Sequence, residues 1–165
     1  MTDASAHLTA LRSVHALCEE AGLEYWLFGG WAVDFHAGRV TRAHDDLDIA
    51  VWLRDLPRIA ALLEQVGWSH APDPEEDGGT GYERGGVRLE LTFLVGKDDG
   101  TVVVPLREHE APWPVDAFPG DDRTLLGVEA RLVGLGALRT QKSGARDDAA
   151  DAEKDAADLR VLSSL

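Results

Sequence analysis

Hydrophobic residues recur along the chain with two different periods, which predict helices in some stretches and strands in others. From about Ser5 to Ala21 the apolar residues follow three- and four-residue steps, which predicts an amphipathic helix that ends at Gly22. The same pattern after Pro57 predicts a second helix that closes at Gly67, because proline is tolerated in the first turn of a helix. The apolar stripes consist of Leu8, Leu11, His15 and Cys18 in the first helix and Ile59, Leu62, Leu63 and Val66 in the second.

Short runs of β-branched and aromatic residues predict strands between these helices. Tyr25–Phe28 is aromatic, and Tyr82–Arg84 and Val87–Val95 flank the pair Gly85-Gly86 in the manner of a β-hairpin. Segments rich in glycine, proline and acidic residues predict loops. Further strands are expected at Leu47–Trp52, Val102–Val104 and Leu125–Leu132, and loops at Ala71–Gly81 and Glu108–Asp122.

The C-terminal part predicts two more helices. One covers Leu135–Lys142, and the other begins at the pair Asp147-Asp148, whose carboxylates suit a helix N-terminus. We expect the acidic run Asp147–Asp158 to be a solvated helix face, and His7 and His15 to be surface or rim residues and not ligands. The acidic loop after the second helix is also expected to be solvated, although it could fold over a substrate. The apolar stripe of the last helix consists of Ala152, Ala156, Leu159 and Leu162.

The glycine pair Gly29-Gly30 joins the aromatic strand to a short helix predicted over Trp31–Ala37. Backbone N–H groups at a helix N-terminus lack partners, and together with the helix dipole they favour an anion such as a phosphate. Gly38 is expected to end this helix in the left-handed conformation, which glycine enters without a Cβ penalty. A glycine pair before a helix is most often a plain turn, and the phosphate site stays open beside that interpretation.

Two aspartates, Asp46 and Asp48, alternate with apolar residues along the next predicted strand. Because strand side chains alternate between faces, the two carboxylates share one face and lie about 7 Å apart, a suitable place for a divalent cation. In the strand Val87–Val95, Glu90 lies on the polar face and would reach the same side if the two strands are neighbours. Glu90 is then a third metal ligand, a general base, or an exposed charge on the sheet.

Length and composition narrow the functional classes. A chain of 165 residues is most simply one domain, and its net charge of −14 argues against nucleic acid as a substrate. An acidic cleft would attract a polycationic small molecule, although an acidic surface also simply favours solubility. Cys18 is the only cysteine, which excludes an intrachain disulfide and a cysteine zinc site. With no signal-like N-terminus and no apolar run of membrane-spanning length, we expect a cytoplasmic protein without a membrane partner.

Three consecutive motifs carry a resemblance to a known family. They are Gly29-Gly30-Trp31-Ala32-Val33-Asp34, Gly38-Arg39-Val40-Thr41-Arg42 and His44-Asp45-Asp46-Leu47-Asp48. Over these motifs the chain resembles the antibiotic-inactivating nucleotidyltransferases of the small aminoglycoside 2″-adenylyltransferase and lincosamide nucleotidyltransferase type. The match is looser elsewhere, at Glu90, Glu153-Lys154-Asp155 and Asp158-Leu159.

The resemblance implies a nucleotidyltransferase fold of the α+β class. This fold has a mixed, mainly antiparallel sheet with helices packed on one side and a short C-terminal helical part. We expect residues 1–132 to form the sheet-containing core, and residues 133–165 to form the C-terminal helices of the same domain. The resemblance also implies Mg²⁺ as cofactor, ATP or another nucleoside triphosphate as co-substrate, and an amine-bearing antibiotic as acceptor. A homodimer is expected, because so short a chain has little second domain to enclose an acceptor.

The resemblance assigns roles to individual residues. Asp46 and Asp48 would be catalytic metal ligands, and Glu90 would be the third ligand or take the proton from the acceptor hydroxyl. Where relatives place an aspartate, this chain has Glu90, one methylene longer, which leaves its role as ligand or base open. The residues expected to bind the triphosphate are Gly29, Gly30, Arg42 and Lys154.

Two other functions remain open from the sequence. One is adenylylation of a protein, as carried out by small toxin–antitoxin nucleotidyltransferases, which generally have a Gly-Ser turn where this chain has Gly-Gly. The other is a nucleotide-binding module that keeps the fold without turnover. The presence of three candidate carboxylates disfavours this second alternative.

Overall fold

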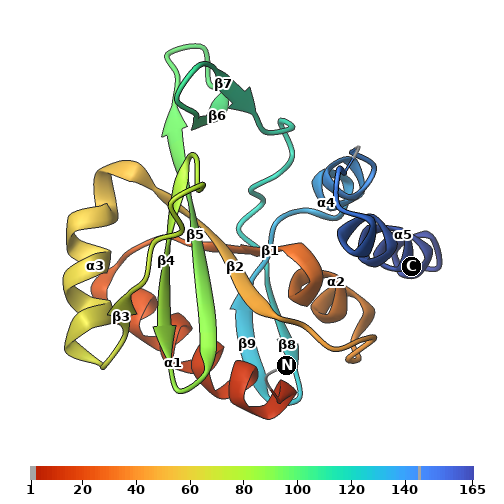
Figure 1. Ribbon diagram of the computed structural model, residues 1–165, viewed down its shortest axis with the longest axis horizontal. Helices are drawn as coiled ribbons and strands as arrows, with labels where there is room; N and C mark the ends of the chain where they lie inside the picture. The colour runs from red at the N-terminus through yellow and green to blue at the C-terminus, as the bar shows by residue number, and fades with distance from the viewer. Residues whose placement is uncertain (1–2, 145) are drawn as a thin grey trace.

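The computed structural model describes residues 3–144 and 146–165, which form five α-helices around two β-sheets (Figure 1). Over these ranges, none of the helices combines the length and the apolar character needed to cross a membrane. In chain order the elements are α1 (Ala4–Ala21), β1 (Trp26–Phe28), α2 (Gly29–Ala37), β2 (Asp46–Trp52), a short 3₁₀ turn (Leu53–Asp55), α3 (Leu56–Gln65), β3 (Ser69–His70), β4 (Gly79–Arg84), β5 (Val87–Gly96), β6 (Val102–Pro105), β7 (Glu110–Pro112), β8 (Asp122–Leu125), β9 (Val128–Arg131), α4 (Leu135–Lys142) and α5 (Ala149–Ser163).

The main sheet has seven strands, with a central order β1-β2-β5-β4-β3, and β6 and β7 extend it from the far end of β5 (Figure 1). Strands β2 and β5 run parallel, whereas the other neighbouring pairs in this sheet are antiparallel. A separate antiparallel hairpin, β8-β9, packs against α1 through β9. The sheet is therefore the mixed, mainly antiparallel one that the resemblance implied.

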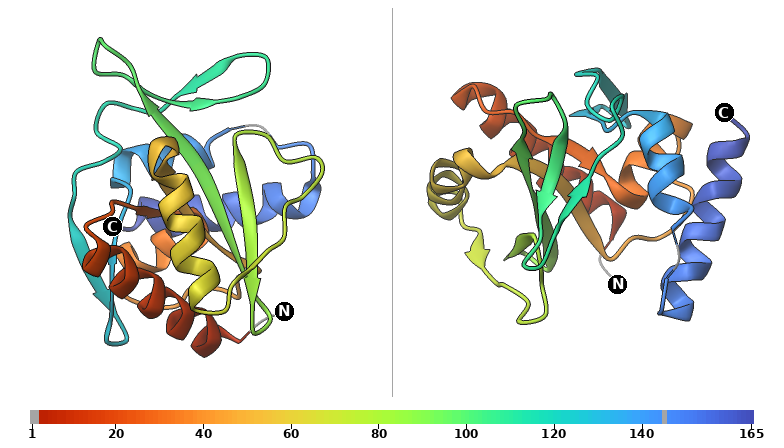
Figure 2. Two further views of the ribbon diagram at one scale, coloured as in Figure 1. Left: turned by 90° about the vertical axis from the view of Figure 1, so that its left-hand side faces the viewer. Right: turned by 90° about the horizontal axis from the view of Figure 1, so that it is seen from above.

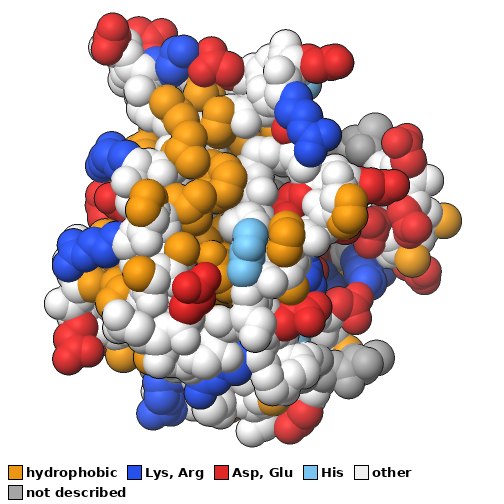
Figure 3. All heavy atoms as spheres, turned by 60° about the vertical axis from the view of Figure 1, so that its left-hand side comes forward, with side chains coloured by type: hydrophobic (Ala, Val, Ile, Leu, Met, Phe, Trp, Pro, Cys, Tyr) orange, Lys and Arg blue, Asp and Glu red, His pale blue; other side chains and the backbone are white. Residues whose placement is uncertain are grey.

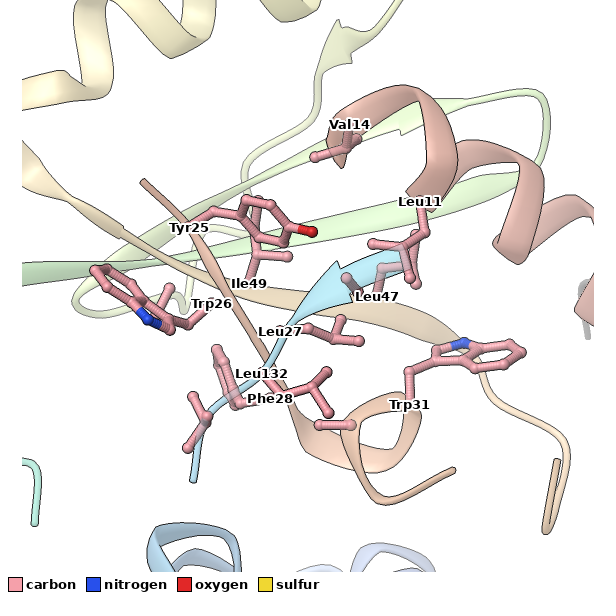
Figure 4. Close-up of a cluster of buried hydrophobic side chains, with 14 of the residues drawn as sticks. Leu11, Val14, Tyr25, Trp26, Leu27, Phe28, Trp31, Leu47, Ile49 and Leu132 are labelled. Carbon is pink, nitrogen blue, oxygen red and sulfur yellow. The ribbon is translucent and has the colours of Figure 1, made fainter. Parts of the chain in front are cut away.

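Helices α1 and α3 cover one face of the main sheet and form the hydrophobic core with it (Figure 2). Leu47 and Ile49 of β2 are at most 1% exposed and lie next to Leu11 and Val14 of α1 (Figure 4). Their alternation along β2 is the one predicted from the sequence. Since full burial of such a side chain stabilises a fold by roughly 1.5–3 kcal/mol, this core fixes which face of β2 points away from the helices.

Helices α4 and α5 pack against each other and against α2 (Figures 1 and 2). Helix α5 begins as predicted, because the Asp148 side chain accepts hydrogen bonds from the backbone N–H groups of Ala150 and Asp151. The apolar stripe expected for α5 is wrong in part, since Ala152 and Ala156 are exposed, whereas Leu162 is buried.

The acidic residues of α5 do not form a purely solvated face, as the sequence had predicted. Asp158 is fully buried and accepts hydrogen bonds from Arg42 Nε at 2.9 Å and Nη2 at 3.0 Å, with Lys142 Nζ also at 3.0 Å. Asp155 is 4% exposed and binds Lys142 at 3.1 Å and Arg146 at 2.8 Å. Burial by itself raises the pKa of Asp158, but hydrogen bonds from Arg42 and Lys142 outweigh this and lower it.

Several boundaries differ from the sequence-based prediction for local reasons. The stretch expected as one strand over Leu125–Leu132 is the hairpin β8-β9, because Leu126 (φ 49°) and Gly127 (φ 79°) reverse the chain. The loop predicted over Ala71–Gly81 ends earlier, since Gly79–Arg84 pairs with β5 as β4. The irregular segment Glu108–Asp122 contains the short strand β7.

The prediction that His7 lies at the surface is wrong. His7 is fully buried, and its Nδ1 accepts a hydrogen bond from Trp31 Nε1 at 2.8 Å. His15 is half-buried, and its Nδ1 lies 2.6 Å from the Tyr25 hydroxyl. Both histidines therefore link α1 to the chain around β1.

Replacing Asp158 by alanine should lower the free energy of unfolding by about 3 kcal/mol, because it leaves the half-buried Arg42 and the buried Lys142 without this partner. Urea denaturation at pH 7 measures the loss. Glu153→Ala on the exposed face of the same helix is the control and should change stability by less than about 0.5 kcal/mol. Equal losses in the two variants would show that the buried ion pairs do not hold α5 in place.

Candidate active site

Acidic side chains gather on the sheet face that points away from α1 and α3. The strand register places Asp48 of β2 opposite Phe28 of β1 on one side and Glu90 of β5 on the other. Residues paired across neighbouring strands project to the same face, so these three form one row. Asp46 lies two residues before Asp48 on β2 and therefore shares this face. Strands β2 and β5 are neighbours, so the condition under which Glu90 reaches this face is met.

A pocket of about 250 Å³ opens in front of the two aspartates. Its walls come from the start of β2 and the loop before it, from the first turn of α2, and from α4, α5 and the segment between them. Figure 3 shows acidic side chains gathered at the right of the view, over the start of α5. The pocket is lined by Gly30, Arg42, His44, Asp45, Asp46, Asp48, Lys142, Arg146, Asp151, Lys154 and Asp155.

The two aspartates repel each other in a poorly hydrated place. Burial raises the pKa of Asp46, and the charge of Glu90 raises it further. Burial also raises the pKa of Asp48 well above the ordinary carboxylate value, and Asp46 and Glu90 add repulsion that Lys142 partly offsets. The carboxyl groups of Asp46 and Asp48 lie within hydrogen-bonding reach of each other. Crowded carboxylates of this kind fit a hard divalent cation such as magnesium, whose charge relieves the repulsion.

Glu90 shares the face of Asp48 but is engaged by other groups. Its Oε1 accepts a hydrogen bond from Arg88 Nε at 2.5 Å, and Arg88 is held in turn by the Ala71 carbonyl at 2.8 Å. Burial and a hydrogen bond with Glu90 raise the pKa of Glu76 to about 7. The acidic loop before β4 therefore contacts β5 through Glu76, while its neighbours Glu75 and Asp77 are exposed, as expected for a solvated loop. Closure of this loop over a substrate stays a prediction.

The carboxylates of Asp46, Asp48 and Glu90 do not converge on one metal position in this structure. Within the described ranges, the one set of three possible metal ligands whose ligand atoms all lie within 4.8 Å of one another is His15, Glu19 and Asp122, on α1 and β8. Convergence of Asp46, Asp48 and Glu90 on one ion therefore needs Glu90 to turn away from Arg88. The assignment of Glu90 as ligand or base stays a prediction.

The two glycines bring the start of α2 into contact with the charged side chains. Gly29 has φ +70°, and a Cβ there would collide with the Asp48 carboxylate. A Cβ on Gly30 would collide with the guanidinium of Arg42 and lie 2.6 Å from Nδ1 of His44. These close approaches explain both glycines more fully than a plain turn does.

Cations line the side of the pocket that faces the aspartates, and each has an acidic partner. Of the two predicted cations, Arg42 binds Asp158, and Lys154 binds Asp45 at 2.6 Å. Sequence reasoning missed Lys142 and Arg146, which α4 and the segment after it contribute to the same wall. A signal for Lys142 was present, since it follows the buried Leu138 by four residues and so continues the inward-facing stripe of α4.

His44 is a further lining residue without an assigned role. Its Nε2 lies 2.5 Å from Oδ2 of Asp34, a fully buried residue of α2. The other oxygen of Asp34 accepts a hydrogen bond from the Thr41 hydroxyl. Both Asp34 and His44 belong to the motifs that carried the resemblance, but neither was assigned a function from the sequence.

Comparisons with known sequences agree with the family resemblance noted in the sequence. A family model described as aminoglycoside-2″-adenylyltransferase matches residues 10–160 of the chain. A curated 2″-aminoglycoside nucleotidyltransferase from Escherichia coli is 35% identical over 63 residues, which make up 38% of this chain and 36% of that relative. The aligned stretch thus spans little more than a third of the relative's own length.

Two solved structures share the fold of this chain. The lincomycin-bound lincosamide antibiotic adenylyltransferase LnuA has a TM-score of 0.73 at 21% identity, covering 93% of this chain and 94% of that one. ANT(2″)-Ia in complex with adenylyl-2″-tobramycin has a TM-score of 0.76 at 22% identity, covering 96% and 88% respectively. At these identities the similarity establishes the nucleotidyltransferase fold.

Replacing Asp48 by asparagine should raise the melting temperature of the metal-free protein. The substitution keeps the shape of the side chain and removes one of the mutually repelling carboxylates. Thermal melting in a chelating buffer at pH 7 measures the effect, with the exposed Asp98→Asn as a control that should melt like the wild type. A melting temperature of Asp48→Asn well below that of the wild type would identify Asp48 as a structural residue.

The Glu76 carboxyl should make stability fall as the pH rises from about 4.5 to about 7. Folding raises the pKa of Glu76 from 4.5 to about 7. Between these two values the folded protein therefore keeps a proton that the unfolded chain has released. Glu76→Gln should flatten this part of the pH profile, whereas the exposed neighbour Glu75→Gln should leave it unchanged. Urea midpoints at pH 5 and pH 7.5 test the difference, and parallel profiles for wild type and Glu76→Gln would contradict it.

Proposed function

The chain belongs to the aminoglycoside-2″-adenylyltransferase family, and from this membership we propose a specific reaction. In our proposal the protein transfers a nucleotidyl group from a nucleoside triphosphate to a hydroxyl of an amine-bearing antibiotic such as an aminoglycoside or a lincosamide. The favoured donor is ATP, from which the adenylyl group is transferred. The observation that carries the proposal is the pocket in which Asp46 and Asp48 face a wall of cations across the start of α2. This arrangement would hold a metal on one side and a triphosphate on the other.

The metal side of the site would consist of Asp46 and Asp48, with Glu90 as an additional ligand if it leaves Arg88. A bound magnesium ion would neutralise charge on the triphosphate and on the attacking oxygen. The protein itself contributes position, since the register of β2 holds both carboxylates on the same face before any ligand binds.

The phosphate side of the site would consist of Gly29 and Gly30 in the first turn of α2, Arg42 and Lys154, the residues that the resemblance implied, together with Lys142 and Arg146. The acidic partners of these side chains fix their positions, so their remaining N–H groups are aimed before the nucleotide arrives. During transfer the acceptor oxygen bonds to the α-phosphorus, the bond to the β-phosphate oxygen breaks, and pyrophosphate leaves.

The acceptor side of the site would include Glu90 and the acidic loop that carries Glu76. Glu90 would take the proton from the attacking hydroxyl, which requires its release from Arg88. Carboxylates next to the reacting group attract the ammonium groups of an antibiotic, in agreement with the net charge of −14.

We also propose that residues 1–165 act as one domain, in a cytoplasmic homodimer. Support for a single domain comes from the ion pairs of Asp158, which connect α5 to Arg42 in the loop before β2. The homodimer is proposed from the resemblance to the family, which suggested it from the sequence. Sedimentation of the purified protein tests the assembly.

Pyrophosphate release from magnesium-ATP should require an antibiotic acceptor, and a panel of aminoglycosides and lincosamides identifies its class. Asp48→Asn should reduce turnover more than tenfold, about 1.4 kcal/mol in the barrier, because it removes a ligand charge from the reacting centre. The exposed Asp98→Asn is the control and should keep the wild-type rate. Retention of more than a tenth of the rate by Asp48→Asn would remove Asp48 from the proposed mechanism.

The same assay separates the alternatives. Transfer of labelled nucleotide to a protein instead of an antibiotic would identify a protein-adenylylating enzyme. Nucleotide binding without pyrophosphate release on any acceptor would identify a binding module.

A further inference from the structure

Arg88 brings a positive charge onto the sheet face that carries the candidate metal ligands. The register of β2 and β5 pairs Arg88 with Asp46, in the same way as it pairs Glu90 with Asp48. Paired residues project to the same face, so the Arg88 side chain starts beside Asp46. Over the described residues, however, its ion pairs are with Glu90 and Glu83 and not with Asp46. Arg88 therefore binds one of the three candidate ligands and leaves the two aspartates without this counter-charge.

The guanidinium of Arg88 has two sets of partners, which use different nitrogen atoms. Its Nε donates to Oε1 of Glu90 at 2.5 Å, whereas its Nη1 donates to the Ala71 carbonyl at 2.8 Å and to Oε1 of Glu83 at 3.3 Å. Ala71 lies in the loop before β4, and Glu83 lies on β4. If the contact with Glu90 breaks, the guanidinium still has a carboxylate and a carbonyl as partners. Glu90 can thus leave without producing an unpaired charge.

Gly81 of β4 makes room for the guanidinium. Gly81 is the partner of Glu90 in the register of β4 and β5, and a Cβ on Gly81 would collide with the Arg88 guanidinium. The absence of a side chain at this position lets the guanidinium lie against the backbone of β4. Arg88 is therefore held by β4 as well as by Glu90.

Glu90 is subject to opposing forces from its neighbours. Its charge raises the pKa of Asp46 and of Asp48, so it is close enough to repel both aspartates. Arg88 attracts it, and each of these two side chains is only 25% exposed, which limits screening by water. Glu76 also reaches Glu90, but a second carboxyl group adds repulsion to its hydrogen bond. With no cation beside the aspartates, this balance keeps Glu90 with Arg88.

A divalent cation beside Asp46 and Asp48 would reverse the balance. Two positive charges at that point attract Glu90 where the aspartates alone repel it. A carboxylate oxygen is also a ligand of the kind that magnesium takes. Arg88 would then keep its contacts with Ala71 and Glu83.

We propose that Arg88 is a positioning residue, which holds Glu90 away from Asp46 and Asp48 until a divalent cation binds there and then releases it to the cation. This inference rests on the proposed function, since it names the residue that controls the third ligand of the proposed metal site. Arg88 acts through Glu90 and touches neither the cation nor the nucleotide. Because its ion pair with Glu90 must break, Arg88 lowers the affinity of the site for the metal.

A double-mutant cycle over Arg88 and Glu90 tests this role. Arg88→Gln removes the ion pair, and Glu90→Gln removes the charge of the proposed ligand. The exposed Arg84 on the neighbouring strand β4 provides the matched control, because Arg84→Gln also removes one positive charge. The probe is Mn²⁺ alone at pH 7, which takes the same oxygen ligands as Mg²⁺ and is measured by electron paramagnetic resonance.

Arg88→Gln should bind Mn²⁺ about tenfold more tightly than the wild type, since no ion pair has to break. Glu90→Gln should bind it more weakly, and the double variant should bind it like Glu90→Gln. Arg84→Gln should match the wild type. Melting temperatures provide a second measurement, because the increase on adding Mn²⁺ follows the affinity and should be largest in Arg88→Gln.

The outcomes separate this inference from the proposed function. Wild-type affinity in Arg88→Gln would overturn the role of Arg88. An equal gain from Arg88→Gln with Glu90 or with Gln at that position would also overturn it, because Arg88 would then act through its charge alone. Both results leave the proposed function intact if Asp48→Asn abolishes Mn²⁺ binding. Wild-type affinity in Asp48→Asn, or no binding by the wild type and Arg88→Gln alike, would overturn the proposed metal site and this inference with it.

Discussion

The carboxylate of Asp158, buried between a guanidinium and an ammonium group, is the contact on which the pocket depends. It joins Arg42, in the loop before β2, to Lys142 on α4, and so holds the helical wall against the sheet. Apolar side chains of similar volume could stabilise such an interface as well as buried charges do. The presence of charged residues here is therefore best explained by a role of the cations in the pocket, toward which their acidic partners orient them.

Features with a local cause were predictable from the sequence. The alternation of Asp46 and Asp48 with buried residues follows from the two-residue period of a strand, and it determined the acidic face correctly. Gly38 ends α2 in the left-handed conformation, as expected from the position of a glycine after a short helix. The bounds of α4 were also predicted correctly.

Features that depend on distant partners were not predictable. The sequence of α5 suggests a solvated acidic face because one of the two cations that bind Asp158, Arg42, lies 116 positions earlier in the sequence. The turn at Leu126-Gly127 lacks the Asn-Gly signal of a hairpin, since Leu126 adopts a positive φ that the sequence alone does not announce. Lys142 and Arg146 lie only 13 and 9 positions from their partner Asp155, and they were missed because helix patterns do not reveal which charges will meet.

The order in which the parts of the pocket appear during synthesis follows from this separation in sequence. Asp46 and Asp48 leave the ribosome early, but their strand reaches its parallel neighbour β5 only after the intervening α3, β3 and β4 have been made. The opposite wall awaits α4 and α5, and Arg42 has no buried counter-charge until Asp158 has emerged. A nascent chain thus carries the acidic half of the site before the cationic wall, which is complete only once α5 has emerged.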